Sequence, residues 1–200
     1  MRTAPELIAY MGRVMFERHL TDMAGGNISI REGNKVYLSP TMAAHKWHWQ
    51  LEPKDIISGS LHTDDLQHHP RFSREGLSHL AVYRAYPQVK GIVHAHPLYV
   101  QPFAVMGKPI EPMMYYTDKY GTIGFIDSVP NYSQEQADNI VLHLRDKLPM
   151  IEKAAAALLM PRHGIFVVGR DIYCAMDAVD RINVSAYCMT VQKLFAPDDS

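Results

Sequence analysis

The chain has 200 residues, of which 47% are hydrophobic and 20% charged, and its formal net charge is −1 at neutral pH. This length and composition predict one folded domain spanning residues 1–200 and exclude a disordered chain. Because acidic and basic side chains nearly balance, nothing in the charge favours a nucleic acid or an acidic membrane surface as a partner.

The sequence also predicts a cytoplasmic protein. No apolar run is long enough to cross a bilayer, and the first residues lack the apolar core of a secretion signal. The two cysteines, Cys174 and Cys188, fall in one predicted helix about 21 Å apart, which is too far for a disulfide between them. This use of cysteine fits a reducing compartment.

The first part of the chain predicts a helix followed by a β-hairpin. Apolar residues recur at helical spacing from Pro5 to Leu20, with Thr3 as a candidate N-cap. The segments 28–31 and 36–38 alternate around a turn and predict two paired strands. A Gly-Gly-Asn loop precedes them. Such a loop can direct backbone N–H groups toward an anion, although an ordinary tight loop is the better explanation of the glycine pair alone.

The middle of the chain predicts a helix that leads into a buried strand. The helix runs from Ser73, its candidate N-cap, to Tyr86, and Glu75 falls in the first turn, where the helix dipole favours a carboxylate. The apolar run that follows predicts a strand ending in His94 and His96, whose side chains share one face because strand residues alternate. Two imidazoles on a stiff support form half of a divalent-metal site, but two surface histidines explain the same pattern.

The remaining local patterns predict a strand within 55–61, a solvated loop over 62–71, helices over 98–106 and 133–148, a strand over 121–126, and a last helix over 171–195 before a short tail. The alanine-rich segment 153–160 has helical propensity, but we interpret its last residues as a strand. The reason is that a turn at 161–164 leads directly into the β-branched run 165–169, which places His163 at the corner of a hairpin.

Five short motifs in this order resemble those of the class II aldolase family. They are Gly26-Asn27-Ile28-Ser29-x-Arg31, Leu38-Ser39-Pro40-Thr41, Ser73-x-Glu75 followed by His79, Val93-His94-Ala95-His96-Pro97, and His163-Gly164-x-x-x-x-Gly169. The resemblance runs from about residue 7 to about residue 190. It implies an α/β fold with three α/β/α layers and a largely antiparallel central sheet.

The resemblance also implies the residues of a metal-dependent active site. Zinc would be bound by His94, His96 and His163, with one position left open, as a catalytic zinc requires. Family members are commonly homotetramers with active sites at the subunit interfaces.

Proton transfer is assigned by the same resemblance. Glu75 would act as acid and base, and a tyrosine from a neighbouring subunit would exchange a proton with the aldehyde oxygen. By position this tyrosine is Tyr115, with Tyr116 and Tyr120 as alternatives. From the residues alone, this polar-aromatic segment is as typical of buried tyrosines as of a site or an interface.

The implied substrate is a sugar phosphate. By resemblance Asn27, Thr41 and Ser73 would bind the phosphate. Arg74 stands where the family frequently has serine, and it would supply a positive charge for a phosphate or a carboxylate.

The implied reaction is class II aldolase cleavage of a ketose phosphate to a dihydroxyacetone-phosphate-type ketone and an aldehyde, through a metal-stabilised enediolate. A sugar-phosphate 4-epimerase is one alternative, although it would use a histidine near the C-terminus and this chain has none after His163. A decarboxylase or dehydratase of a sugar-acid or thiosugar phosphate is another. The cytoskeletal protein adducin has this domain without the metal histidines, and all of them are present here.

Overall fold

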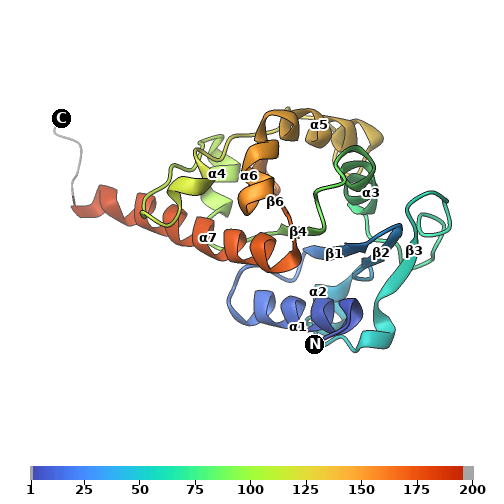
Figure 1. The fold of residues 1–200 in the computed structure, drawn as a ribbon. Helices are drawn as coiled ribbons and strands as arrows, with labels where there is room; N and C mark the ends of the chain where they lie inside the picture. The colour runs from blue at the N-terminus through green and yellow to red at the C-terminus, as the bar shows by residue number, and fades with distance from the viewer. Residues whose placement is uncertain (1, 196–200) are drawn as a thin grey trace.

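The computed structural model describes residues 2–195 and is built around one six-stranded sheet (Figure 1). The strands lie in the order β3-β2-β1-β4-β6-β5, and each neighbouring pair is antiparallel. Their bounds are β1 Asn27–Glu32, β2 Lys35–Leu38, β3 Ile57–Ser60, β4 Gly91–Ala95, β5 Ala155–Met160 and β6 Gly164–Gly169. The antiparallel central sheet implied by the resemblance is therefore confirmed.

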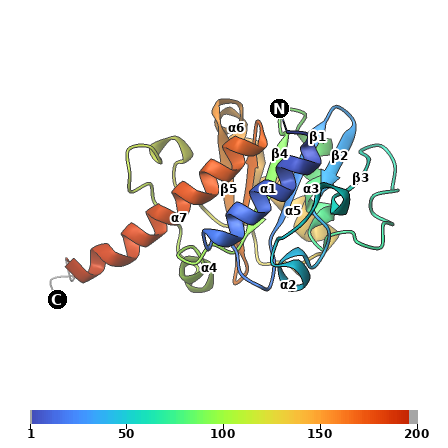
Figure 2. The same ribbon diagram turned by 90° about the horizontal axis from the view of Figure 1, so that it is seen from below.

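Helices cover both faces of this sheet. They are α1 Ala4–Glu17, α2 Ala43–Trp47, α3 Gly76–Ala85, α4 Gln101–Met106, α5 Gln134–Leu144, α6 Leu148–Lys153 and α7 Ile172–Phe195. One buried cluster packs α1 and α7 against one face, and a second packs α3, α5 and α6 against the other. Figure 2 shows α1 and α7 together on the near side of the sheet. The three α/β/α layers are thus present as expected.

The central strands are buried on both faces because each supplies side chains to both clusters. In β6, Ile165 and Val167 join the α1–α7 side, whereas Phe166 and Val168 join the α3–α5 side. This division follows from the two-residue period of a strand. The polar residues at the end of β4 are consequently buried, with His94 1% and His96 7% exposed.

Several local predictions are confirmed. Thr3 caps α1, accepting from the Glu6 N–H at 3.5 Å, while the Glu6 carboxylate accepts from the Thr3 N–H at 2.7 Å. The hairpin β1–β2, the loop over 62–71 and the Ser133 cap of α5 are as predicted. Both cysteines are free. The predicted tail after residue 195 lies outside the described residues.

Two predictions are wrong. Ser73 does not cap α3, which begins at Gly76; the residues before it form a turn in which the Ser73 carbonyl accepts from the Gly76 N–H at 2.9 Å. The segment 121–126 makes two isolated bridges instead of a strand, because it contacts the edge strand β5 at Phe125 and a loop at Ile123 without a continuous partner.

The predicted helix over 133–148 ends early: α5 stops at Leu144, and a 3-10 turn at Arg145–Lys147 leads into α6, which begins at Leu148. Pro149 lies in the first turn of α6, where the absence of its N–H has no cost, whereas in mid-helix it would remove a hydrogen bond. The proline therefore sets the start of a new helix.

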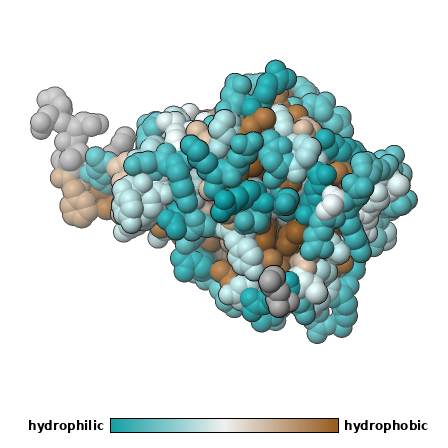
Figure 3. Space-filling model, in the orientation of Figure 1, coloured by the Kyte–Doolittle hydropathy of each residue, from teal (hydrophilic) through white to brown (hydrophobic). Residues whose placement is uncertain are grey.

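The face shown in Figure 3 is mainly hydrophilic, with apolar side chains at the outer end of α7. Phe195, at that end, is 85% exposed. Among the described residues, no helix combines the length and apolarity needed to span a membrane.

Gly12 in α1 provides a test of the packing on this side of the sheet. A Cβ at position 12 would lie 2.1 Å from Cε3 of Trp49, whose side chain is fully buried. Overpacking costs about 1–3 kcal/mol, and the better helix propensity of alanine offsets up to about 1 kcal/mol. We expect Gly12→Ala to lower the free energy of unfolding by roughly 1–2 kcal/mol in urea denaturation.

Gly124→Ala is the matched control, since a Cβ there would meet no atom within 4 Å. Equal urea midpoints for the two variants would contradict the packing argument.

Candidate metal centre

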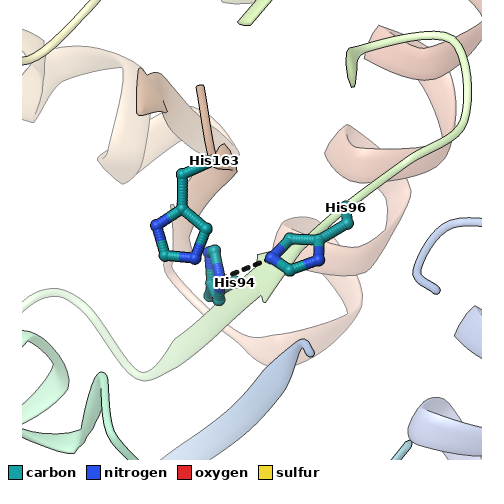
Figure 4. A group of neighbouring side chains, drawn as sticks. All are labelled: His94, His96 and His163. Atoms are coloured by element: carbon teal, nitrogen blue, oxygen red, sulfur yellow. Dashed lines mark hydrogen bonds between the residues drawn. The ribbon is translucent and has the colours of Figure 1, made fainter. Parts of the chain in front are cut away.

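Three histidines from two chain segments meet at one end of β4. His94 belongs to β4, His96 follows it directly, and His163 lies in the turn that joins β5 to β6. Because Ala95 pairs with Ile165 across β4 and β6, this turn is held beside the end of β4. One ring nitrogen from each histidine lies within 4.8 Å of the others (Figure 4). The structure thus brings together the three residues that the resemblance indicated.

The hydrogen bonds of two of these rings determine which nitrogen carries the proton. Nδ1 of His94 lies 3.1 Å from the carbonyl oxygen of Ile165, and Nδ1 of His96 lies 2.9 Å from a carboxylate oxygen of Asp22. Both oxygens can only accept, so both Nδ1 atoms donate. The Nε2 atoms of His94 and His96, each with a lone pair, are then 3.2 Å apart. The dashed line in Figure 4 marks this contact.

This arrangement fits a bound cation. Two lone pairs at hydrogen-bonding distance repel each other unless a proton or a metal ion lies between them. Burial, with His163 and His96 as further causes, holds the pKa of His94 well below its usual range. Burial, followed by His96, lowers the pKa of His163 to about 4. Neutral imidazoles are the form that binds metals.

Glu75 completes the cluster from the start of α3. Its Oε1 lies 3.4 Å from Nε2 of His163 and 3.7 Å from Nε2 of His94. Its Oε2 accepts a hydrogen bond from Nδ2 of Asn27 at 2.7 Å. Oε1 itself has no hydrogen-bond donor among residues 2–195. The side chain therefore presents one free oxygen to the histidines.

Burial raises the pKa of Glu75 to about 7, while the hydrogen bond from Asn27 and the charge of Arg74 act in the opposite direction. A cation among the histidines would also favour the carboxylate. A carboxyl group held in this position can exchange a proton with a molecule in the pocket.

The residues suggested for phosphate binding line the same pocket as the histidines and Glu75. They are Asn27, Thr41, Ser73 and Arg74. The first residue of β1, the turn after β2 and the turn before α3 supply them. The Nδ2 amide group of Asn27 has a second N–H besides the one given to Glu75. Segments far apart in sequence thus form one polar pocket.

The three candidate tyrosines lie outside the lining of this pocket. Tyr120 is buried, and its hydroxyl donates to the Asp177 carboxylate at 3.1 Å. The guanidinium of Arg181 lies 5.0 Å from the ring centre of Tyr116. Tyr115 is 85% exposed. Of the three, Tyr115 is the one whose ring is most accessible to another molecule.

The pocket also contains an aromatic side chain that the sequence did not indicate. Tyr132 lines the pocket, with the Arg74 guanidinium 4.6 Å from its ring centre and its ring edge-on to His163 at 5.7 Å. Its φ of +66° is uncommon for tyrosine, and its N–H donates to Oε1 of the buried Gln136 at 3.0 Å. No motif contains Tyr132, and the only local signal was its place before the Ser133 cap.

The antiparallel sheet between two helical layers, together with a buried three-histidine cluster, defines a class of metal-site α/β/α proteins. A family model described as "Class II Aldolase and Adducin N-terminal domain" matches residues 6–190. The chain belongs to this family, which supports a lyase-type enzyme.

Proteins similar to this chain are named for more than one reaction. An L-fuculose phosphate aldolase of Methanococcus maripaludis is 25% identical over 181 residues, covering 88% of this chain and 92% of that protein. A 3-oxo-tetronate 4-phosphate decarboxylase of Haemophilus influenzae is 27% identical over 190 residues, covering 90% and 84%. The structure of L-fuculose-1-phosphate aldolase from Thermus thermophilus superposes with a TM-score of 0.81 at 19% identity, covering 100% and 99%. This last likeness confirms the fold.

The histidine cluster leads to a prediction about metal content. We expect purified protein to contain close to one divalent metal ion per chain, since three nitrogen donors converge in a buried site. His94→Ala should lose most of this metal in elemental analysis. His68→Ala, which changes an exposed loop histidine, should retain it. Full metal content in single alanine variants at all three cluster positions would rule out the centre.

Proposed function

We propose that this chain is a metal-dependent aldolase that cleaves a ketose phosphate into a dihydroxyacetone-phosphate-type ketone and an aldehyde. The observation that carries the proposal is the free Oε1 of Glu75, which faces the three histidines at the bottom of a pocket lined by Asn27 and Arg74. Similarity over most of the chain to L-fuculose phosphate aldolases supports it.

The proposed cofactor is one zinc ion held by His94, His96 and His163. Three neutral nitrogen donors with an open position are the set that catalytic zinc prefers. When bound, a divalent metal would supply Lewis-acid polarisation of the substrate carbonyl.

The chain's own residues would move the protons. In the cleavage direction the bond between C3 and C4 breaks, and its electron pair stays with the ketone fragment. Glu75 would deliver a proton from Oε1 to C3, while the C4 hydroxyl gives up its proton as it becomes the aldehyde. Asn27, which holds Oε2, would keep Oε1 turned toward the histidines. Each proton lost by one group is thereby gained by another.

Tyr115 is the proposed acceptor of the C4 proton. Its ring is exposed and outside the pocket of its own chain, so this role requires a second subunit. We propose a homotetramer whose active sites lie at subunit interfaces.

Substrate phosphate would be held by Asn27, Thr41 and Ser73, with Arg74 as the source of positive charge. Phosphate accepts hydrogen bonds from each of these side chains, and guanidinium binds it in a bidentate manner. Their common place in the pocket supports this assignment.

A decarboxylase acting on a sugar-acid phosphate is the second candidate. Arg74 lines the pocket and would pair with a substrate carboxylate, and the similarity to a 3-oxo-tetronate 4-phosphate decarboxylase extends over 90% of the chain. This reaction also breaks a carbon–carbon bond next to a carbonyl, so the same acid would serve.

The two candidates separate in one experiment. Zinc-loaded protein is incubated with a panel of ketose 1-phosphates and 3-oxo sugar-acid phosphates, and both aldehyde and CO2 are measured. Aldehyde release from ketose phosphates would support the aldolase. CO2 release alone would replace it with the decarboxylase, and no turnover on either set would contradict both.

Glu75→Gln tests the proton transfer. The amide preserves the shape of the side chain but cannot act as a base, so exchange of the ketone α-proton with deuterated solvent should slow by about 10²–10⁴-fold. The exchange is followed by NMR, with metal content measured in parallel. Glu135→Gln, on the exposed start of α5, should exchange at the wild-type rate. Wild-type exchange in a metal-loaded Glu75→Gln protein would exclude Glu75 as the base.

Mixed oligomers test whether Tyr115 acts across an interface. We expect Tyr115→Phe and Glu75→Gln to be nearly inactive alone. Co-expressed subunits should regain activity, because about one quarter of randomly assembled interface sites contain both unaltered groups. Tyr173→Phe, which alters another exposed tyrosine, is the control. No recovery in the mixture, or an active monomer in light scattering, would contradict the assignment.

A further inference from the structure

We propose that Asp22 is a positioning residue that fixes the orientation and the proton of His96 for metal binding. The proposal rests on the metal centre of the proposed function but assigns a residue outside the three histidines and Glu75. Oδ1 of Asp22 lies 2.9 Å from Nδ1 of His96. Since a carboxylate only accepts, Nδ1 must donate, and the Nε2 lone pair is left facing the cluster.

His96 needs such a partner more than His94 does. His94 lies within β4, where it pairs with Asn27 of β1 and Phe166 of β6. His96 lies beyond the last paired residue of β4, so no strand partner holds its backbone in register. The hydrogen bond that Nδ1 of His96 donates to Asp22 therefore replaces a constraint that the sheet supplies only to His94.

The loop that contains Asp22 folds closely around the His96 ring. Oδ1 of Asp22 also accepts from the Ala24 N–H at 2.9 Å, and the Thr21 hydroxyl donates to the Gly25 carbonyl at 3.0 Å. A Cβ at Gly25 would lie 2.7 Å from Cε1 of His96. One loop thus contacts the ring at both Nδ1 and Cε1, which leaves little freedom for it to rotate.

The same loop leads into the polar pocket. After Gly25 the chain passes through Gly26, with a φ of +92°, to Asn27, whose amide donates to Glu75. Asp22 therefore links His96 to the loop that leads into Asn27. Carboxylates that accept from the second nitrogen of a metal-binding histidine fix its tautomer and raise its basicity.

The test measures metal affinity in the full chain, because activity alone would not separate this role from others. Zinc dissociation constants are obtained by competition with a chromophoric chelator for wild type, Asp22→Ala and Asp22→Asn. Loss of such an outer partner weakens metal binding by about 10–100-fold, and we expect this of Asp22→Ala. Asp22→Asn should lose less, because its amide oxygen still accepts from Nδ1–H.

A matched control and a spectroscopic readout exclude a general loss of structure. Asp138→Ala removes an exposed aspartate whose side chain, within residues 2–195, bonds only that of Gln134, and it should bind zinc as wild type does. The visible absorption of bound Co²⁺ should change in Asp22→Ala and not in the control. Melting temperatures of the metal-free proteins show whether each variant is folded.

The outcomes are distinct. Wild-type zinc affinity and an unchanged Co²⁺ spectrum in Asp22→Ala would overturn the proposal while leaving the metal centre intact. A loss of affinity equal in Asp22→Ala and Asp138→Ala would overturn it as well. A wild-type protein that binds no metal would overturn the metal centre, and this proposal with it.

Discussion

The pairing of β4 with strands on both sides is the constraint on which the rest of the site depends. On one side β4 lies against β1, so that Asn27 is directly opposite His94. On the other side it lies against β6, which brings the turn containing His163 to the same end of the sheet. Hydrogen-bonded strands lie about 5 Å apart, so residues far apart in sequence meet within the reach of one metal ion.

The chemistry depends on how this end of the sheet is buried. Inside the molecule an unpaired polar atom is costly, yet Oε1 of Glu75 and Nδ1 of His163 are buried and have no hydrogen-bond partner among residues 2–195. Two Nε2 lone pairs also face each other at 3.2 Å. A native structure keeps such groups where a ligand satisfies them, which is why the cluster indicates a bound cation more strongly than the histidine pattern alone does.

The loops around this rigid end provide what the strands do not. Side chains of a strand project at right angles to the sheet. The pocket beside the histidines must therefore be closed by loops and turns outside the sheet. The loop before β1 places Asp22 beside His96, and the segment before α5 contributes Tyr132 to the pocket. Proteins similar to this chain are named for different reactions, which fits a shared scaffold on which loop residues set the chemistry.

The sequence by itself determined most of the secondary structure and, through its resemblance to one family, the fold class and the proposed roles of the three histidines and Glu75. These features depend on local periodicity, on caps such as Thr3, and on motifs whose order along the chain resembles one family. Local patterns failed at Ser73, where a turn replaces the predicted cap, and at 121–126, where residues 2–195 offer no continuous partner strand.

Only the tertiary structure decided which side chains surround the histidines. Asp22 and Tyr132 are 74 and 31 residues away in sequence from the histidines that they contact, and neither has a local signature. Their places follow from strand order, loop paths and backbone conformations such as the positive φ of Tyr132. These are properties of the packed chain, because a contact between distant segments exists only once the sheet has set their relative positions.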